Sequence, residues 1–189
     1  MTTLPDLDRY LAIDCEMVGC KSGQALAKVG IVNHEGSVKL ESFVYVNPGN
    51  VTDYRTSSSG IKAGDLEGAP IFEDITAKVK DLLKGKIVVG HTLFNDLNAI
   101  GHRHPYEDFR DTALYYPLRK KLGVNREGDY PSLKRLSKVI LGVDIQQNGD
   151  AGHDPIEDAR ATMSIFLSVR EEYESSLAKD EDVVSGIPA

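Results

Sequence analysis

Two carboxylates stand two residues apart at the end of an apolar run. Asp14 and Glu16 follow Leu11-Ala12-Ile13, a run that predicts a buried strand. Successive side chains of a strand alternate between its faces, so both carboxylates point to the same side. Charges of like sign repel there, and a bound cation relieves that repulsion. The pair therefore indicates a metal site, and the alternative is a frayed strand end with both acids in water.

A third acid, Asp96, lies on the apolar side of an expected helix. In the segment Thr92–Ile100, Asp96 follows Leu93 by three residues and precedes Ile100 by four, a spacing that places it on the buried stripe. The helix begins just past an apolar β-branched run, so Asp96 is expected within about two turns of the sheet edge. The alternative is a structural acid that accepts a hydrogen bond from a neighbouring backbone amide.

The fourth acid, Asp158, stands in the first turn of a helix whose start is well marked. Asp154 is a favourable N-cap, Pro155 suits the first helical position, and Glu157 adds an acidic capping residue. Asp158 begins an inward-facing stripe that continues with Thr162, Ile165, Phe166 and Val169. His153 precedes the cap, five residues before Asp158. A histidine at this place is suited to proton transfer beside an inward-facing carboxylate.

Together these residues predict an oxygen-rich site for two divalent cations. Four acids on three separate elements, Asp14, Glu16, Asp96 and Asp158, favour Mg²⁺ or Mn²⁺ over Zn²⁺. The sequence contains no G-x-S-x-G, G-x-x-x-x-G-K-[ST], G-x-G-x-x-G or H-E-x-x-H motif. These absences exclude the serine-hydrolase elbow, the P-loop, the dinucleotide fold and the zincin site as alternatives.

The elements that must position these residues predict an α/β fold. Alternating and continuous apolar patterns predict strands, and spacings of three and four predict helices. Expected strands cover Tyr10–Met17, Ala25–Asn33, Val38–Val46, Ile87–Val89 and Phe109–Thr112, and expected helices cover Ile71–Leu83, Thr92–Ile100, Ser132–Leu141 and 155–175. We expect a three-stranded antiparallel meander plus parallel strands, flanked by helices, with Asn47–Gly60 as a long polar loop.

Length and composition favour one domain. With 189 residues and 41% hydrophobic residues, the chain suits a single domain over residues 1–175, followed by a polar tail, 176–189, that we expect to be disordered. The net charge of −7 argues against a protein that coats duplexes, but not against an enzyme that grips one chain end through metals. No signal peptide or membrane-spanning run is present, so an intracellular protein without membrane contact is expected.

These residues, taken together, resemble the DEDD superfamily of 3′→5′ exonucleases in its histidine branch (DEDDh), which has a ribonuclease-H-like fold. The similarity covers nearly the whole chain. It rests on Leu11–Gly19, Val51–Thr56, Ser59–Ile61, Val88–His91, Asn95–Leu97, Arg110–Thr112, Ser132–Lys134, Ile145-Gln146 and His153 with Glu157–Met163. The D-C-E-M-V-G start and the T-D-Y-R-T loop look most like the RNA exonuclease 4 branch, which also contains the interferon-stimulated exonuclease.

The resemblance implies roles for the acids and the histidine. It implies that Asp14 bridges two metals, that Glu16 and Asp158 complete the first site, that Asp96 anchors the second, and that His153 is the general base. The implied reaction releases nucleoside 5′-monophosphates from an RNA 3′ end. The alternatives are a single-stranded DNA exonuclease and a catalytically silent nucleic-acid-binding module on the same fold. The resemblance further implies ribosomal RNA processing in the nucleus or nucleolus, and we expect a monomer.

Two ambiguities remain at this level. His91 and His153 each stand five residues before one of the acids, so spacing does not choose the base, although the family pattern favours His153. Candidate substrate contacts are Met17, Arg55 and His91. The alternatives are core packing for Met17, a solvated loop residue for Arg55, and a residue that fixes the backbone for His91.

Overall fold

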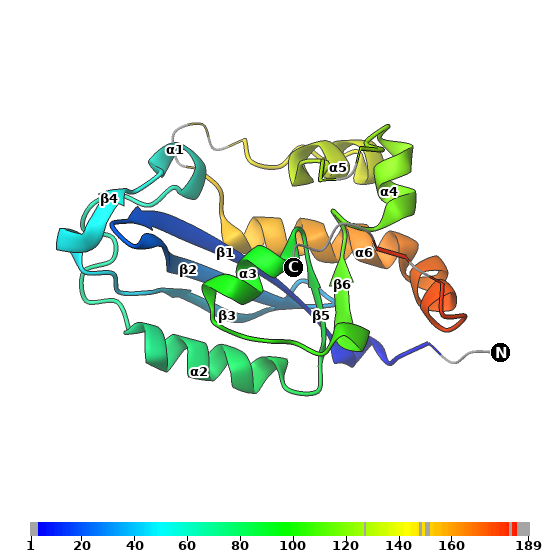
Figure 1. Ribbon diagram of the computed structural model, residues 1–189, viewed down its shortest axis with the longest axis horizontal. Helices are drawn as coiled ribbons and strands as arrows, with labels where there is room; N and C mark the ends of the chain where they lie inside the picture. The colour runs from blue at the N-terminus through cyan, green and yellow to red at the C-terminus, as the bar shows by residue number, and fades with distance from the viewer. Residues whose placement is uncertain (1–3, 127, 148, 150–151, 182, 185–189) are drawn as a thin grey trace.

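The computed structural model describes residues 4–126, 128–147, 149, 152–181 and 183–184, and it confirms the α/β class (Figure 1). The strands are β1 (Tyr10–Cys20), β2 (Gly23–Asn33), β3 (Val38–Phe43), β4 (Val51–Asp53), β5 (Ile87–Gly90) and β6 (Phe109–Asp111). The α-helices are α1 (Thr56–Ser59), α2 (Phe72–Leu83), α3 (Leu93–Ala99), α4 (Tyr116–Lys121), α5 (Leu133–Leu141) and α6 (Pro155–Leu177).

The sheet has the expected mixed topology, with strand order β3-β2-β1-β5-β6. β1 pairs antiparallel with β2, which pairs antiparallel with β3, whereas β1, β5 and β6 run parallel. The short β4 pairs antiparallel with the far end of β1. Because β1 is central, its residues Tyr10–Ile13 are fully or almost fully buried, which explains the continuous apolar run that ends at Asp14.

Helices cover the sheet, and α6 crosses its centre. α6 packs against β1 and β2, and α5 packs against α6 (Figure 1). Gly30 on β2 makes this approach close, because a Cβ there would lie 2.9 Å from both Ile156 Cδ1 and the Pro155 carbonyl carbon. The first turn of α6 therefore lies directly against β2, which pairs with the strand β1 that contains the apolar run.

Three segments differ from the expectation. Asn47–Gly60 contains the strand β4 and the helical turn α1, and α4 forms where no helix was expected. All three elements are too short to show a periodic pattern. α6 continues to Leu177, and beyond it Val183 and Val184 are buried, with Val184 bridging to Tyr115. Val183 and Val184 thus pack against the domain, while residues 182 and 185–189 lie outside the described residues.

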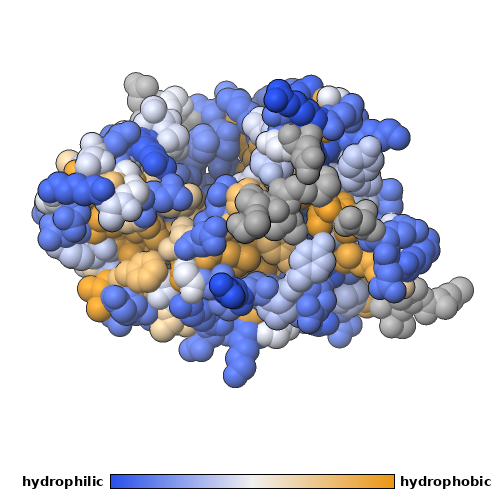
Figure 2. All heavy atoms as spheres, in the orientation of Figure 1, coloured by the Kyte–Doolittle hydropathy of each residue, from blue (hydrophilic) through white to orange (hydrophobic). Residues whose placement is uncertain are grey.

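The surface is polar over α4 and α5 and more apolar near the start of α2. Figure 2 shows hydrophobic residues gathered across the middle and lower left of the face drawn. Ile71 and Phe72, at the start of α2, are 50% and 38% exposed. Among the described residues, no helix is long and apolar enough to cross a membrane.

Candidate active site

The first pair of acids lies at an irregularity of β1. Asp14 pairs with Gly30 of β2, and the register shifts between Glu16 and Met17. Such a bulge bends a strand and redirects its side chains. Asp14 is half-buried and Glu16 is only 9% exposed. The two carboxylates therefore do not belong to a frayed, solvated strand end.

Asp96 is positioned by a buried carboxylate at the start of α3. Asp111, which is fully buried, accepts hydrogen bonds from the amides of Thr92, Leu93, Ala113 and Leu114 at 2.7–3.1 Å. This fixes α3 to the end of β6. Asp96 itself is 5% exposed and accepts a hydrogen bond from the Cys15 amide at 2.8 Å. Thus Asp96 faces inward as expected, and it also makes the structural bond of the alternative interpretation.

Asp158 faces inward from the first turn of α6. The helix is capped by Asp154, whose Oδ1 accepts from the Ile156 amide at 3.1 Å. Asp158 is 3% exposed, and its Oδ2 accepts a hydrogen bond from Gln146 Nε2 at 2.8 Å. Its Oδ1 is buried and has no hydrogen-bond partner within the described part of the chain. A buried carboxylate oxygen without a donor is costly unless a cation occupies the space beside it.

The carboxyl groups of the four acids influence one another's ionisation. Burial and then the carboxylates of Asp96, Asp158 and Glu16 raise the pKa of Asp14 well above its ordinary value. Burial, followed by Asp158 and Asp96, raises the pKa of Glu16 to about 8. Burial also raises the pKa of Asp96 well above its ordinary value and that of Asp158 to about 6. Each effect opposes ionisation of the carboxyl groups. A bound divalent cation would favour their ionised forms.

His153 lies at the edge of this cluster. Its Nδ1 is 3.6 Å from Asp158 Oδ2, and ligand atoms of Glu16, His153 and Asp158 all lie within 4.8 Å of one another. The side chain is 38% exposed. Partial burial, followed by the charge of Lys134, lowers the pKa of His153. The imidazole is therefore neutral near pH 7, the form that a general base requires.

His91 has a different environment. Its Nδ1 lies 3.0 Å from Thr112 Oγ1, and its Nε2 lies 2.8 Å from the Pro131 carbonyl oxygen. Burial lowers the pKa of His91 to about 4, so the ring is neutral and both nitrogens are engaged. A ring held on both sides links β5 to the segment before α5 and has no free nitrogen for a substrate proton. The geometry favours His153 as the base.

The other two candidate substrate contacts lie outside the acid cluster. Met17 is half-buried and packs against the main hydrophobic core, which agrees with the packing alternative. Arg55 is exposed, adopts a left-handed backbone conformation before α1, and its Nη1 lies 3.3 Å from Gln24 Oε1. Contact of either residue with a substrate remains a prediction.

Two positioning residues had no role assigned from the sequence. Gln146 has φ +55° and holds Asp158 through its side chain, while its backbone amide donates to Glu157 Oε2 at 3.0 Å. Asp111 fixes α3, as described above. Both residues fall within stretches of the family resemblance. No periodicity marks either one, because each acts on an element distant in sequence.

The cluster fits the divalent cations expected from the sequence. Carboxylate oxygens are hard ligands, and Glu16, His153 and Asp158 are close enough to share one ion. The unpartnered Oδ1 of Asp158 supplies a free ligand atom. The residues present therefore can hold a metal ion.

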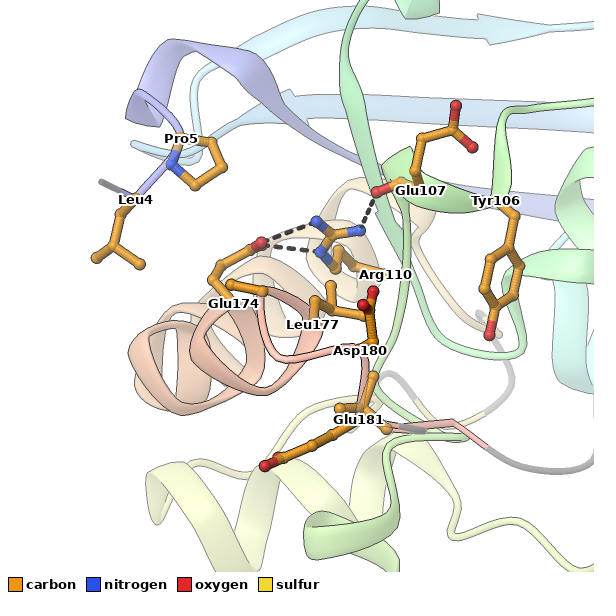
Figure 3. A pocket seen from close by; sticks show the side chains of 11 residues that line it. Leu4, Pro5, Tyr106, Glu107, Arg110, Glu174, Leu177, Asp180 and Glu181 are labelled. Carbon is orange, nitrogen blue, oxygen red and sulfur yellow. Dashed lines mark hydrogen bonds and ion pairs between the residues drawn. The ribbon is translucent and has the colours of Figure 1, made fainter. Parts of the chain in front are cut away.

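A cavity elsewhere in the molecule contains neither the four acids nor His153. Its volume is about 600 Å³, and it is lined by residues near both ends of the chain, such as Leu4 and Leu177, and by residues from its middle, such as Tyr106 (Figure 3). Its two buried charges, Arg110 and Glu174, neutralise each other through two bonds of 2.8 Å. This pair joins α6 to β6. The acids are the candidate active site, because buried carboxyl groups with raised pKa values are concentrated there.

Comparison with known proteins identifies the family of this chain. The family model RNase_T, described as exonuclease, matches residues 11–166. RNA exonuclease 4 of Mycosarcoma maydis is 46% identical over 171 residues, which are 89% of this chain and 44% of the relative. RNA exonuclease 4 of Homo sapiens is 42% identical over 178 residues, or 92% of this chain and 40% of the relative. The chain thus spans less than half the length of these relatives.

Solved structures show the same architecture. The Neurospora crassa Pan2 catalytic unit has a TM-score of 0.74 at 26% identity, covering 95% of this chain and 30% of the other. The Saccharomyces cerevisiae Pan2 pseudoubiquitin hydrolase–RNA exonuclease module, in complex with AAGGAA RNA, has a TM-score of 0.71 at 28% identity, covering 93% and 33%. The resemblance seen in the sequence is confirmed, and this chain belongs to the RNase_T exonuclease family of DEDD nucleases.

Proposed function

We propose that this protein is a 3′→5′ exoribonuclease that releases nucleoside 5′-monophosphates by two-metal-ion hydrolysis. The observation that carries the proposal is the convergence of four carboxylates from three elements beside a neutral, partly exposed histidine. Burial, followed by the neighbouring carboxylates, raises the pKa values of Asp14 and Glu16, and a bound cation would favour their ionised forms. Family membership supports exonuclease chemistry, because the matched region contains all five residues.

The chain's own residues divide the work of hydrolysis. Asp14, Glu16, Asp96 and Asp158 would hold Mg²⁺ or Mn²⁺. Two such ions, when bound, stabilise the attacking and leaving oxygens of an in-line displacement at phosphorus. His153 accepts the proton of the attacking water, for which its neutral ring and partial exposure suit it. Gln146 keeps Asp158 oriented through the hydrogen bond to its Oδ2.

RNA is the proposed substrate because of the relatives. Those at 42–46% identity are RNA exonucleases, and a Pan2 exonuclease module of the same fold is seen with RNA. Met17, next to the bulge, would lie against the terminal nucleotide, and the exposed Arg55 would reach a phosphate or a ribose hydroxyl. We further propose, from the RNA exonuclease 4 relationship, that the protein acts on ribosomal RNA in the nucleolus as a monomer.

A timed digest tests the proposal. A 5′-labelled RNA and a DNA of matched sequence are incubated with the protein and Mg²⁺, Mn²⁺ or EDTA, with Asp14→Asn as the inactive control. The expected result is an RNA ladder that shortens one nucleotide at a time, only with metal and only with the unaltered protein. A clear preference for DNA would reassign the substrate, since hydrolysis at phosphorus does not itself need a 2′-hydroxyl. Intact RNA in Mn²⁺ would instead indicate a silent binding module.

A further inference from the structure

The side chain of His153, the proposed general base, is only weakly held in place by its own contacts. His153 Nδ1 is 3.6 Å from Asp158 Oδ2, longer than an ordinary hydrogen bond, and the side chain is 38% exposed. A general base must nevertheless stay within hydrogen-bond reach of the proton that it removes. The position of His153 therefore depends on the backbone that carries it.

That backbone rests on the helical turn α1. The His153 amide donates to the Ser58 carbonyl oxygen at 2.7 Å. The preceding residue, Gly152, has φ +69°, and a Cβ added there would overlap the amide nitrogen and Cα of Gly60 and lie 2.9 Å from the Ser59 carbonyl carbon. These are backbone atoms, which cannot turn aside as a flexible side chain could. Only glycine permits this approach.

The turn that receives Gly152 is itself anchored to the strand of the first two acids. The Ser59 side chain is buried; its Oγ donates to the Tyr54 carbonyl oxygen at 2.7 Å and accepts from the Ile61 amide at 3.1 Å. Just before this turn, β4 pairs with β1 at Asp53 and Gly19. A continuous set of contacts therefore joins the acid-bearing strand to the loop of His153, as the proximity of β4, α1 and β1 in Figure 1 shows.

On its other side, His153 is followed by the capped start of α6. Asp154 accepts from the Ile156 amide at 3.1 Å, and Lys28 Nζ lies 3.5 Å from the same Asp154 oxygen. The backbone of His153 is thus held at two points, one on α1 and one on α6. The first of these points exists only because residue 152 has no side chain.

We propose that Gly152 is a positioning residue for catalysis, which seats the loop of His153 on the Ser58–Gly60 turn and so sets the distance of the imidazole from Glu16 and Asp158. This inference rests on the proposed function. Because Arg55 begins the same turn, the segment proposed to contact RNA also determines the position of the base.

The test compares two glycines of the same loop. Gly149 also has positive φ, +55°, but an added Cβ there meets no atom within 4 Å, so Gly149→Ala carries the backbone strain without the overlap. We expect Gly152→Ala to lower kcat on labelled RNA by about tenfold or more, a fraction of what a general base contributes. KM and the increase in Tm on adding Mn²⁺ should stay unchanged. Gly149→Ala should stay within about twofold of the unaltered protein.

A double-variant cycle separates positioning from general damage. If Gly152 acts through His153, then Gly152→Ala causes no further loss in a His153→Ala background. If Gly152→Ala lowers kcat by a similar factor in that background, the inference is overturned. It is also overturned if the unaltered enzyme is active and Gly152→Ala and Gly149→Ala have equal kcat. Inactivity of the unaltered protein on RNA would instead refute the proposed function.

A second variant covers the case in which Gly152→Ala does not fold. Ser59→Ala removes the hydroxyl that shapes the α1 turn without adding an atom. It should lower kcat in the same direction while the response of Tm to Mn²⁺ persists. Unchanged kcat in the folded Ser59→Ala protein counts against positioning of the His153 loop by the Ser58–Gly60 turn.

Discussion

Asp96 accepts a hydrogen bond from the backbone amide of Cys15 through its Oδ1, at 2.8 Å. Cys15 stands between Asp14 and Glu16, so this bond joins α3 to β1 at the residue flanked by both strand acids. The bond draws a third carboxylate to a place where two already repel each other. Without a cation, this arrangement opposes folding, because burial and like charges both disfavour ionisation.

Removing one of the repelling acids should stabilise the metal-free protein and abolish its activity. Asp14→Asn keeps the shape of the side chain and removes its charge. We expect a Tm in EDTA higher by several degrees, since about 1 kcal/mol corresponds to ~2–4 °C in a domain of this size, together with a kcat lower by at least about 100-fold. Thermal melts with EDTA and with Mn²⁺ measure the first effect, and the RNA digest measures the second.

The matched control for this prediction is Glu67→Gln at an exposed position. It should change neither quantity. In Mn²⁺ the unaltered protein should gain stability, because the ion binds the native state, while Asp14→Asn should not. A lower Tm for Asp14→Asn in EDTA would contradict the repulsion inferred from the cluster.

The stability of the metal-free protein should fall as the pH rises. Burial, Asp158 and Asp96 raise the pKa of Glu16 from 4.5 to about 8, so folded Glu16 keeps a proton that the unfolded chain releases. Its contribution is fully present below about pH 4.5 and is lost as the pH rises towards 8. Urea unfolding in EDTA between about pH 5 and 8.5 measures this.

The same experiment has an internal control. Glu16→Gln removes the titrating group, so its free energy of unfolding should depend less steeply on pH. Asp158 and Asp111, whose pKa values burial raises to about 6, still contribute a decline below that pH. Stability that increases from pH 5 to 8 in EDTA would be inconsistent with raised pKa values in the cluster.

Replacing His153 should lower activity, whereas replacing His91 should lower stability. His153→Ala is expected to lower kcat by about 10²–10⁴-fold, the usual contribution of a general base, while the Tm increase with Mn²⁺ is kept. His91→Ala should cost about 1–3 kcal/mol of stability, because it leaves the Pro131 carbonyl and Thr112 hydroxyl without this partner. The pH profile of kcat distinguishes them: His153→Ala should flatten its acidic limb, and a profile flattened only by His91→Ala would reverse the assignment.

Asp111 should be required for the fold near α3. In Asp111→Asn, an amide N–H₂ replaces an oxygen that accepts from a backbone amide; the present Oδ2 accepts from Leu93 at 2.7 Å. Two donors then face each other, and a buried donor without an acceptor costs about 1–3 kcal/mol. Urea denaturation should show this loss at pH 8, where the carboxyl is ionised. Asp111→Asn with unaltered stability would show that the four amide bonds contribute little.

The charged pair of the large cavity should affect stability alone. Glu174→Ala leaves Arg110 buried without its carboxylate partner, and breaking a buried pair in this way costs about 3–5 kcal/mol. At a temperature where the variant is still folded, kcat on RNA should match that of the unaltered protein. A selective loss of kcat with full stability would move part of the reaction to this cavity.

Local patterns were sufficient for the longer elements and for the direction of each acid, but not for β4, α1 and α4. The strand period of two placed Asp14 and Glu16 on one face, and the helical period placed Asp96 and Asp158 inward; the buried positions of Glu16, Asp96 and Asp158 agree. The N-cap at Asp154 was also predicted correctly. These features depend on neighbours within a turn or a pleat, so the order of residues expresses them directly.

The sequence by itself therefore determined the fold class, the family and the inward direction of the acids. Tertiary structure alone decided that both nitrogens of His91 are engaged, that Gln146 holds Asp158, and that the loop of Gly152 rests on α1. Each of these depends on a contact between segments far apart in the chain, including a Pro131 carbonyl 40 residues from His91. Such contacts follow from how strands pair and helices pack, and no local period records them.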